Sequence, residues 1–279
     1  MSEEMMSRRN FLGGVGVALG LAVVPSVLTK PAVAEAAALK AFPWSYTTLD
    51  ADKVARRAYE VYYASGCMEA TWWPIVDALA TSNLPDAATT WGTLPKDMMK
   101  FGGGGVAGWG TLCGTLNGSC AIIAAVGGPA KASDEAMQYY AETPIPTNGV
   151  DVSIRKGDWV PVYPTGAKIP ATGRPLVNVP TSTAHSQLCH ASLSQWTMTT
   201  GSADGTIEQK DRCGKACYDM VFKTVTMLNA WKADPTAIPA GKLDPSIAAC
   251  QTACHTTPIA KGKMACDSCH DETVTHLSK

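Results

Sequence analysis

Hydrophobic residues recur with a helical period in residues 50–82, and the pattern is interrupted once. The positions on one face are Val54, Ala55, Ala58, Val61, Tyr62 and Ser65. This spacing predicts an amphipathic helix. Gly66 interrupts it, and a second helical segment follows that carries Cys67 near its beginning.

Three further helices are predicted along the chain. Residues 113–126 are apolar nearly all round, which is typical of a buried helix. Residues 133–140 predict a shorter helix with Ser133 as its N-cap. Residues 186–231 have helical character throughout, and the clearest helix spans 210–231. Its apolar side carries Met220, Val221, Val225 and Leu228.

Residues 143–183 differ because prolines recur among glycines and valines, at positions 144, 146, 161, 164, 170, 175 and 180. This composition favours loops and extended segments, with short strands at best. We therefore expect a mainly α fold with irregular, Pro/Gly-rich loops and few short strands. The helical, cysteine-bearing domain should span 38–232, with the Pro-rich insertion 143–183, and a C-terminal segment should span 233–279.

The N-terminus has the pattern of an export signal. The run Ser7-Arg8-Arg9-Asn10-Phe11-Leu12 precedes an apolar stretch, then Pro25 and small residues. This pattern predicts a twin-arginine signal over residues 1–36, cleaved within 34–37, and a periplasmic mature protein. An uncleaved anchor is the alternative. There is no second long apolar segment, so we expect no membrane attachment after cleavage. The net charge of −1 leaves no basic face for nucleic acid.

The C-terminal segment contains two candidate haem-attachment motifs. The run Cys266-Asp267-Ser268-Cys269-His270 has the C-x-x-C-H spacing of a c-type haem site. The run Cys250-Gln251-Thr252-Ala253-Cys254-His255 repeats it with one extra residue. A zinc site or a disulfide is the alternative, but zinc does not need histidine next to cysteine. We therefore predict two covalent haems c, with thioethers from Cys250, Cys254, Cys266 and Cys269. The proximal iron ligands would be His255 and His270.

Only three histidines remain as distal iron ligands: His185, His190 and His276. Met198 and Met264 are the methionine alternatives. His255 and His270 are 15 positions apart, which brings the two haems close together. So short a segment cannot cover two porphyrins. Their apolar edges must be buried by the main body or by a second subunit.

Six further cysteines need an explanation: Cys67, Cys113, Cys120, Cys189, Cys213 and Cys217. Three disulfides are one interpretation for an exported protein. The other is an iron–sulfur cluster bound by four of them. Glycine-rich surroundings let backbone N–H groups approach sulfur, and twin-arginine export implies a cofactor loaded before export. Both observations favour the cluster.

One motif resembles a known signature. After a run of glycines, Leu112-Cys113-Gly114-Thr115-Leu116-Asn117-Gly118 is similar to the Cys-Gly-Ala-x-x-Gly signature of a family of redox-active proteins, with Thr115 in place of Ala. The resemblance implies cluster ligands at Cys67, Cys113, Cys189 and Cys213, with Cys217 as a rival for the last place. Cys120 has no counterpart and is interpreted as a small core residue.

Together with the export signal and the two haem motifs, this domain resembles the split-Soret cytochromes c. The segment from Leu188-Cys189-His190 to Trp196 is similar to one in that family. The resemblance implies a homodimer that exchanges iron ligands between subunits, and two haems packed together in each subunit. It also implies an iron–sulfur cluster, predicted as [2Fe–2S]. Among the distal ligands, it favours His190. His185, five positions away, has a spacing that could serve a neighbouring iron, and His276 is the third candidate.

The predicted function is electron transfer with redox partner proteins, because iron with two histidine ligands has no open site for a substrate. One alternative is a small-molecule reductase with a five-coordinate haem. Another is a structural or haem-storage module held by disulfides.

Overall fold

The computed structural model describes residues 40–168, 178–239, 245, 247, 263 and 264. Three groups of predicted features lie outside these residues. They are the signal segment 1–36, the haem thioether cysteines Cys250, Cys254, Cys266 and Cys269, and the histidines His255, His270 and His276. No helix among the described residues is long and apolar enough to span a membrane.

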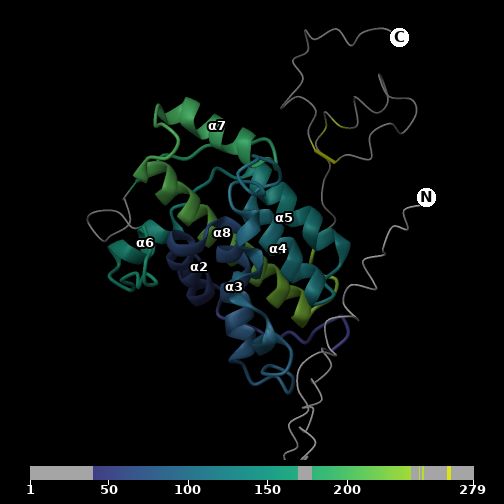
Figure 1. Cartoon of the computed structure of the whole chain (residues 1–279). Helices are drawn as coiled ribbons and strands as arrows, with labels where there is room; N and C mark the ends of the chain where they lie inside the picture. Colours follow the sequence, from purple (N-terminus) through teal and green to yellow (C-terminus); the bar gives the residue numbers. More distant parts are fainter. Residues whose placement is uncertain (1–39, 169–177, 240–244, 246, 248–262, 265–279) are drawn as a thin grey trace, which may run out of the picture. The chain divides into compact units, whose positions relative to one another are not determined.

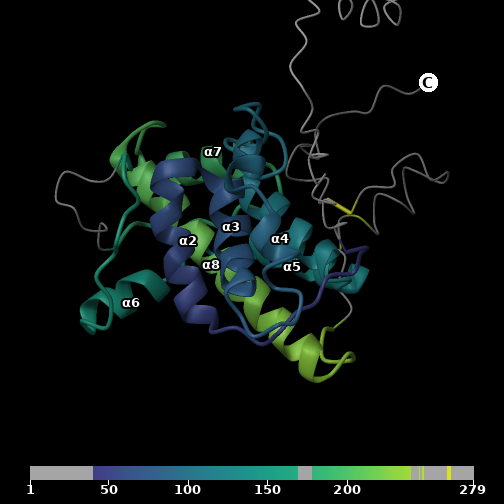
Figure 2. The same ribbon diagram turned by 60° about the horizontal axis from the view of Figure 1, so that its bottom comes forward.

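Three helices lie side by side in the order α2, α3, α4, and α8 packs across them (Figure 1). Helix α2 is Ala51–Ser65, α3 is Cys67–Ala80, α4 is Gly114–Ala125 and α8 is Ile207–Ala233. Figure 2 shows α5, Ala130–Glu142, beside α4, while the short α6, Gly149–Arg155, lies on the other side of α2. The central position of α8 explains why its middle turns are almost entirely buried.

Side-chain caps and one glycine fix the ends of the main helices. Asp50 accepts a hydrogen bond from the backbone N–H of Lys53 at the start of α2, and Thr206 caps α8 through Gln209. Gly66 has φ of +87°, a conformation that side chains rarely adopt, so α2 stops there and α3 begins at once. The predicted break at Gly66 is confirmed.

The mainly α class is confirmed, with three differences in detail. Helix α5 begins at Ala130 after Pro129, so the prediction of Ser133 as N-cap is wrong. Proline has no N–H to lose at a helix start, and it moves the boundary three residues earlier. Helix α6 lies within the stretch expected to be extended. The described residues contain no strand, only isolated bridges of Ile145 with Ser182 and of Leu112 with Leu188.

The predicted helical region 186–231 is two helices. Helix α7, Cys189–Thr200, ends at Gly201, which adopts the left-handed conformation with φ of +72°. Residues 201–206 then connect it to α8. Two 3₁₀ helices, Trp91–Thr93 and Lys96–Gly102, precede the glycine-rich loop before α4.

Candidate metal centre

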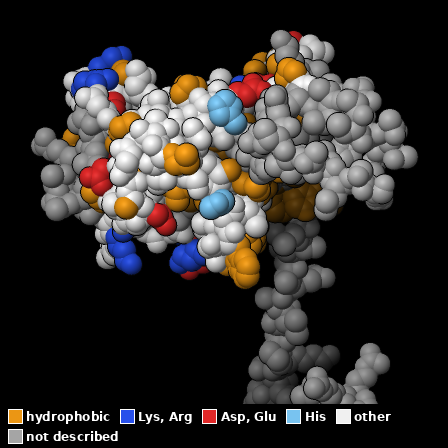
Figure 3. Space-filling view, turned by 90° about the horizontal axis from the view of Figure 1, so that it is seen from above, with side chains coloured by type: hydrophobic (Ala, Val, Ile, Leu, Met, Phe, Trp, Pro, Cys, Tyr) orange, Lys and Arg blue, Asp and Glu red, His pale blue; other side chains and the backbone are white. Residues whose placement is uncertain are grey.

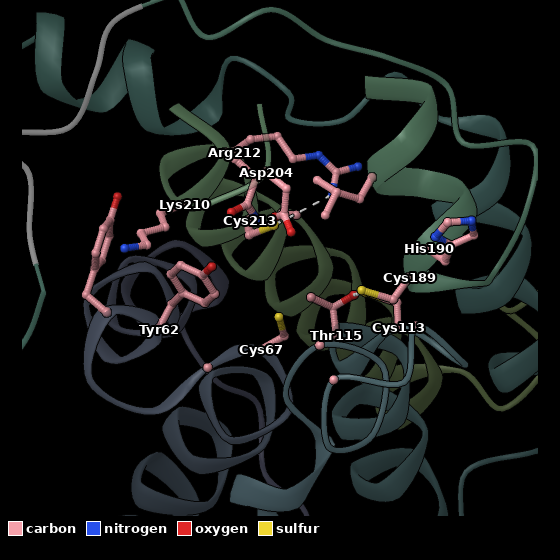
Figure 4. A pocket seen from close by; sticks show the side chains of 18 of the residues that line it. Tyr62, Cys67, Cys113, Thr115, Cys189, His190, Asp204, Lys210, Arg212 and Cys213 are labelled. Atoms are coloured by element: carbon pink, nitrogen blue, oxygen red, sulfur yellow. Dashed lines mark hydrogen bonds between the residues drawn. The ribbon is translucent and has the colours of Figure 1, made fainter. Parts of the chain in front are cut away.

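Four cysteines from four separate segments line one cavity of about 450 Å³ (Figure 4). They are Cys67, Cys113, Cys189 and Cys213, the four expected as cluster ligands. Cys217 does not line the cavity. It is fully buried, with its Sγ 3.9 Å from the carbonyl oxygen of Cys67. Cys120 is only partly buried and also lies outside the lining.

Three of the four cysteines lie at the N-terminal end of a helix. Cys67 is the first residue of α3, Cys113 is the N-cap of α4, and Cys189 is the first residue of α7. Helix N-termini carry partial positive charge and unpaired N–H groups, which stabilise thiolates. Cys213 lies within α8 instead. The cavity therefore suits an anionic ligand set.

The glycine after Cys113 lets the starts of α3 and α4 meet. A Cβ on Gly114 would lie 2.5 Å from the carbonyl oxygen of Gly102 and 2.9 Å from the Cβ of Cys67. Both distances are too short for any side chain. The Cys-Gly pair in the motif is thus required by the close approach that brings Cys113 beside Cys67.

A glycine-rich loop aligns the third cysteine with the second. Residues 104–108 all have positive φ, including Val106 and Ala107, and Gly110 does as well. Beyond this loop the chain pairs with the start of α7. The N–H of His190 donates to the oxygen of Gly110 at 3.0 Å, and that of Cys189 donates to Thr111 at 2.7 Å. Cys113 and Cys189 are held together by this pairing.

Hydrogen bonds and burial separate the pKa values of the thiols. A hydrogen bond with the Cys189 thiol lowers the pKa of Cys113 against the effect of burial, and Thr115 lowers it further. The same bond raises the pKa of Cys189. Burial raises the pKa of Cys213 to about 11, partly offset by the Arg212 guanidinium. The pair of Cys113 and Cys189 thus readily supplies one thiolate.

One buried polar atom of the cavity lining lacks a partner, Nε of Arg212. Such a group is costly unless something else satisfies it. A donor set of four cysteines beside a buried cation with an unpaired donor fits an anionic thiolate-bound group. No three histidine, cysteine or acidic side chains among the described residues are close enough to hold a single metal ion.

The six cysteines of the helical body are free thiols in the described structure. The interpretation of three disulfides therefore has no counterpart among these residues. Cys120, expected to be a core residue, is only partly buried, and burial raises its pKa.

The two described histidines, His185 and His190, are both exposed and lie on one face of the molecule (Figure 3). His190 also lines the cysteine cavity (Figure 4). His185 has φ of +51°, and its N–H donates to the oxygen of Ala141. Met198 is exposed on α7, and Met264 is partly exposed. Either imidazole is accessible to a group outside the helical body.

Sequence reasoning missed three residues that surround the cysteines: Tyr62, Gln209 and Arg212. Gln209 precedes Cys213 by one helical turn, so the spacing on α8 was the available signal. The periodicity placed Tyr62 on a helix face but did not mark it as a site residue, and nothing marked Arg212, because packing between distant helices brings both to the cavity.

Comparison with known proteins gave one protein and one solved structure of the same name. No protein-family model matches the chain. Split-Soret cytochrome c of Desulfovibrio desulfuricans is 26% identical over 306 aligned positions that cover 98% of each chain. A solved structure described as showing a novel iron centre in split-Soret cytochrome c of that organism matches with a TM-score of 0.65. It covers 83% of this chain and 91% of the other. The chain is therefore similar to split-Soret cytochrome c in sequence and in mainly helical fold, as its motifs predicted.

Proposed function

We propose that this chain is an exported dihaem c-type cytochrome that also binds an iron–sulfur centre and transfers electrons. The convergence of Cys67, Cys113, Cys189 and Cys213 on one cavity carries the iron–sulfur part of the proposal. The similarity to split-Soret cytochrome c supports the role of a c-type cytochrome in electron transfer.

The four cavity cysteines would hold a cluster, which we propose is of the [2Fe–2S] type. Such a cluster supplies one-electron transfer when bound. Burial of Cys67 and Cys113 keeps water from their sulfurs, and the helix starts orient three of the four cysteines. Cys217 is less suited, because it is fully buried and does not line the cavity.

The haem-bearing segment has two described residues between its motifs, and both contact the helical body. Lys263 pairs with Asp134 of α5 at 2.7 Å. The hydroxyl of Ser186 donates to the sulfur of Met264 at 3.7 Å. Ser186 lies in sequence between His185 and His190. These contacts support haems near the histidine face, with His190 as the first distal ligand and His185 and His276 as alternatives.

We also propose a homodimer in which distal histidines bind haem iron of the partner subunit. Two observations support it: His190 is exposed, and the large apolar side chain of Trp109 is 82% exposed on the adjacent glycine-rich loop. Export to the periplasm through the twin-arginine signal completes the proposal. A small-molecule reductase with a five-coordinate haem is the alternative, and carbon monoxide binding by the native protein would favour it.

The test measures iron, acid-labile sulfide and mass of the purified full chain. We expect two covalent haem masses, plus non-haem iron and sulfide in stoichiometric amounts. Cys113→Ser should abolish the sulfide and keep both haems, whereas Cys120→Ser, the matched control outside the cavity, should keep all three. Two haems without sulfide in the native protein would contradict the iron–sulfur part, and a single haem mass would contradict the dihaem part.

A further inference from the structure

The guanidinium of Arg212 is buried beside the cysteine cavity without an acidic partner among the described residues. The residue is 3% exposed. Its Nη2 donates to the hydroxyl of Ser192 at 2.6 Å, and its Nη1 lies 3.9 Å from the sulfur of Cys213. Its Nε has no partner. A buried charge requires compensation, and the thiol of Cys213, which can carry negative charge, lies within contact of the guanidinium.

Two further donors point at the sulfurs themselves. Nε2 of Gln209 donates to the sulfur of Cys213 at 3.1 Å. The hydroxyl of Thr115 lies 3.2 Å from the sulfur of Cys113. A metal-bound cysteine is a thiolate and can only accept, so the Thr115 hydroxyl must be the donor when metal is bound. Both donor side chains are buried, which strengthens the bonds.

We propose that Arg212, Gln209 and Thr115 set the reduction potential of the centre in this cavity and raise it. The inference rests on the proposed iron–sulfur function and deepens it. One-electron reduction adds negative charge to the thiolate ligand set, with no bond made or broken. A nearby cation and hydrogen bonds to sulfur stabilise the reduced form more than the oxidised form, which makes the potential more positive.

Thr115 supplies its hydroxyl two residues after Cys113, so an alanine at this position would leave the Cys113 sulfur without that donor. Arg212 also has a second contact, since it joins α8 to α7 through Ser192. A substitution of Arg212 removes both the contact with Ser192 and the positive charge, so the experiment must separate these two effects.

The test is a redox titration of the full-length protein, following the electron paramagnetic resonance signal of the reduced centre. Thr115→Ala should lower the equilibrium constant for reduction by about threefold, the scale of one hydrogen bond. Gln209→Leu should act in the same direction. Arg212→Gln should lower it by about tenfold or more, which is a shift of about 59 mV for a one-electron couple. Arg212→Lys keeps the charge and should recover most of the shift.

Two controls separate tuning from packing. Ser119→Ala removes a buried hydroxyl from the same helix as Thr115, away from the sulfurs, and should leave the potential unchanged. Ser192→Ala removes the contact between α7 and α8 but keeps the charge, and it should also leave the potential unchanged. Potentials in Thr115→Ala and Arg212→Gln equal to the native value, with iron and sulfide retained, would overturn the inference. Absence of non-haem iron from the native protein would overturn the proposed function instead.

Discussion

The buried ammonium of Lys215 is the centre of an ion-pair and hydrogen-bond network that stabilises this fold. It lies 2.7 Å from Oδ1 of Asp151 and 3.1 Å from Oδ2 of Asp211. The hydroxyls of Tyr59 and Tyr63 also donate to Asp211. All five residues are buried. The network joins α2, α6 and α8 in a setting where unpaired charge is costly.

Replacing Lys215 by Met should destabilise the protein by about 3–5 kcal/mol, because two buried carboxylates lose their cation. Chemical denaturation measures the loss. The control is Lys223→Met on the same helix. Lys223 pairs with Glu135 near the surface, where such a pair contributes about 0–1 kcal/mol. Equal losses in the two variants would contradict the assigned role of the network.

Asp219 makes stability depend on pH. Its carboxylate accepts hydrogen bonds from the backbone N–H and the hydroxyl of Thr147. Burial nevertheless raises the pKa of Asp219 from 3.8 to about 6. The folded state therefore holds this proton at a higher pH than the unfolded state. The resulting stabilisation is complete below pH 3.8 and is lost as the pH rises through about 6.

Asp219→Asn should remove this dependence. Between pH 4 and 7, the free energy of unfolding of the native protein should fall relative to that of the variant by about 2 kcal/mol, since this interval covers most of a shift of roughly two pKa units. Denaturant titrations of both proteins across this interval measure the difference. Parallel curves would show that Asp219 does not titrate there.

Among the secondary-structure elements, the starts of α3 and α4 make a close contact beside the cysteine cavity. Gly114→Ala should force these helices apart, reduce stability by about 1–3 kcal/mol and lower the non-haem iron content. Gly92→Ala is the control, since a Cβ there would make only ordinary contacts of 3.6 Å or more. Full iron content in Gly114→Ala would show that the helix starts can separate without loss of the site.

Hydrophobic periodicity and helix-breaking residues predicted the helices well where the local pattern was strong, as at the break at Gly66 and along α8. They failed where the local signal was weak. Pro129 rather than Ser133 sets the start of α5, and the seven residues of α6 carry too little pattern to stand out among prolines. The four cysteines of the cavity were selected by resemblance, since their convergence depends on long-range packing. Arg212 could not be found in advance, because burial of a charge is a property of the folded state.

For the whole molecule, the proposed role of the exposed His190 would link haem ligation to dimer assembly. If it binds haem iron of a partner subunit, His190→Ala should turn one haem per subunit high-spin and increase dimer dissociation at least tenfold. Absorption spectra and analytical ultracentrifugation measure these two effects. His185→Ala is the comparison, because His185 is exposed on the same face. A low-spin spectrum with an unchanged dimer in His190→Ala would transfer the role to His185 or His276.

The cavity cysteines are supplied by α3, the N-cap of α4, α7 and α8, so they span most of the helical body in sequence. A nascent chain has no complete ligand set until α8 has left the ribosome. Contacts between residues so far apart in the sequence also form slowly. A centre that needs all four sulfurs can therefore form only once α8 has been synthesised and has emerged. Because metal binding and folding are coupled, truncated or misfolded chains would stay free of iron. Iron acquisition would then act as a quality check on the finished chain.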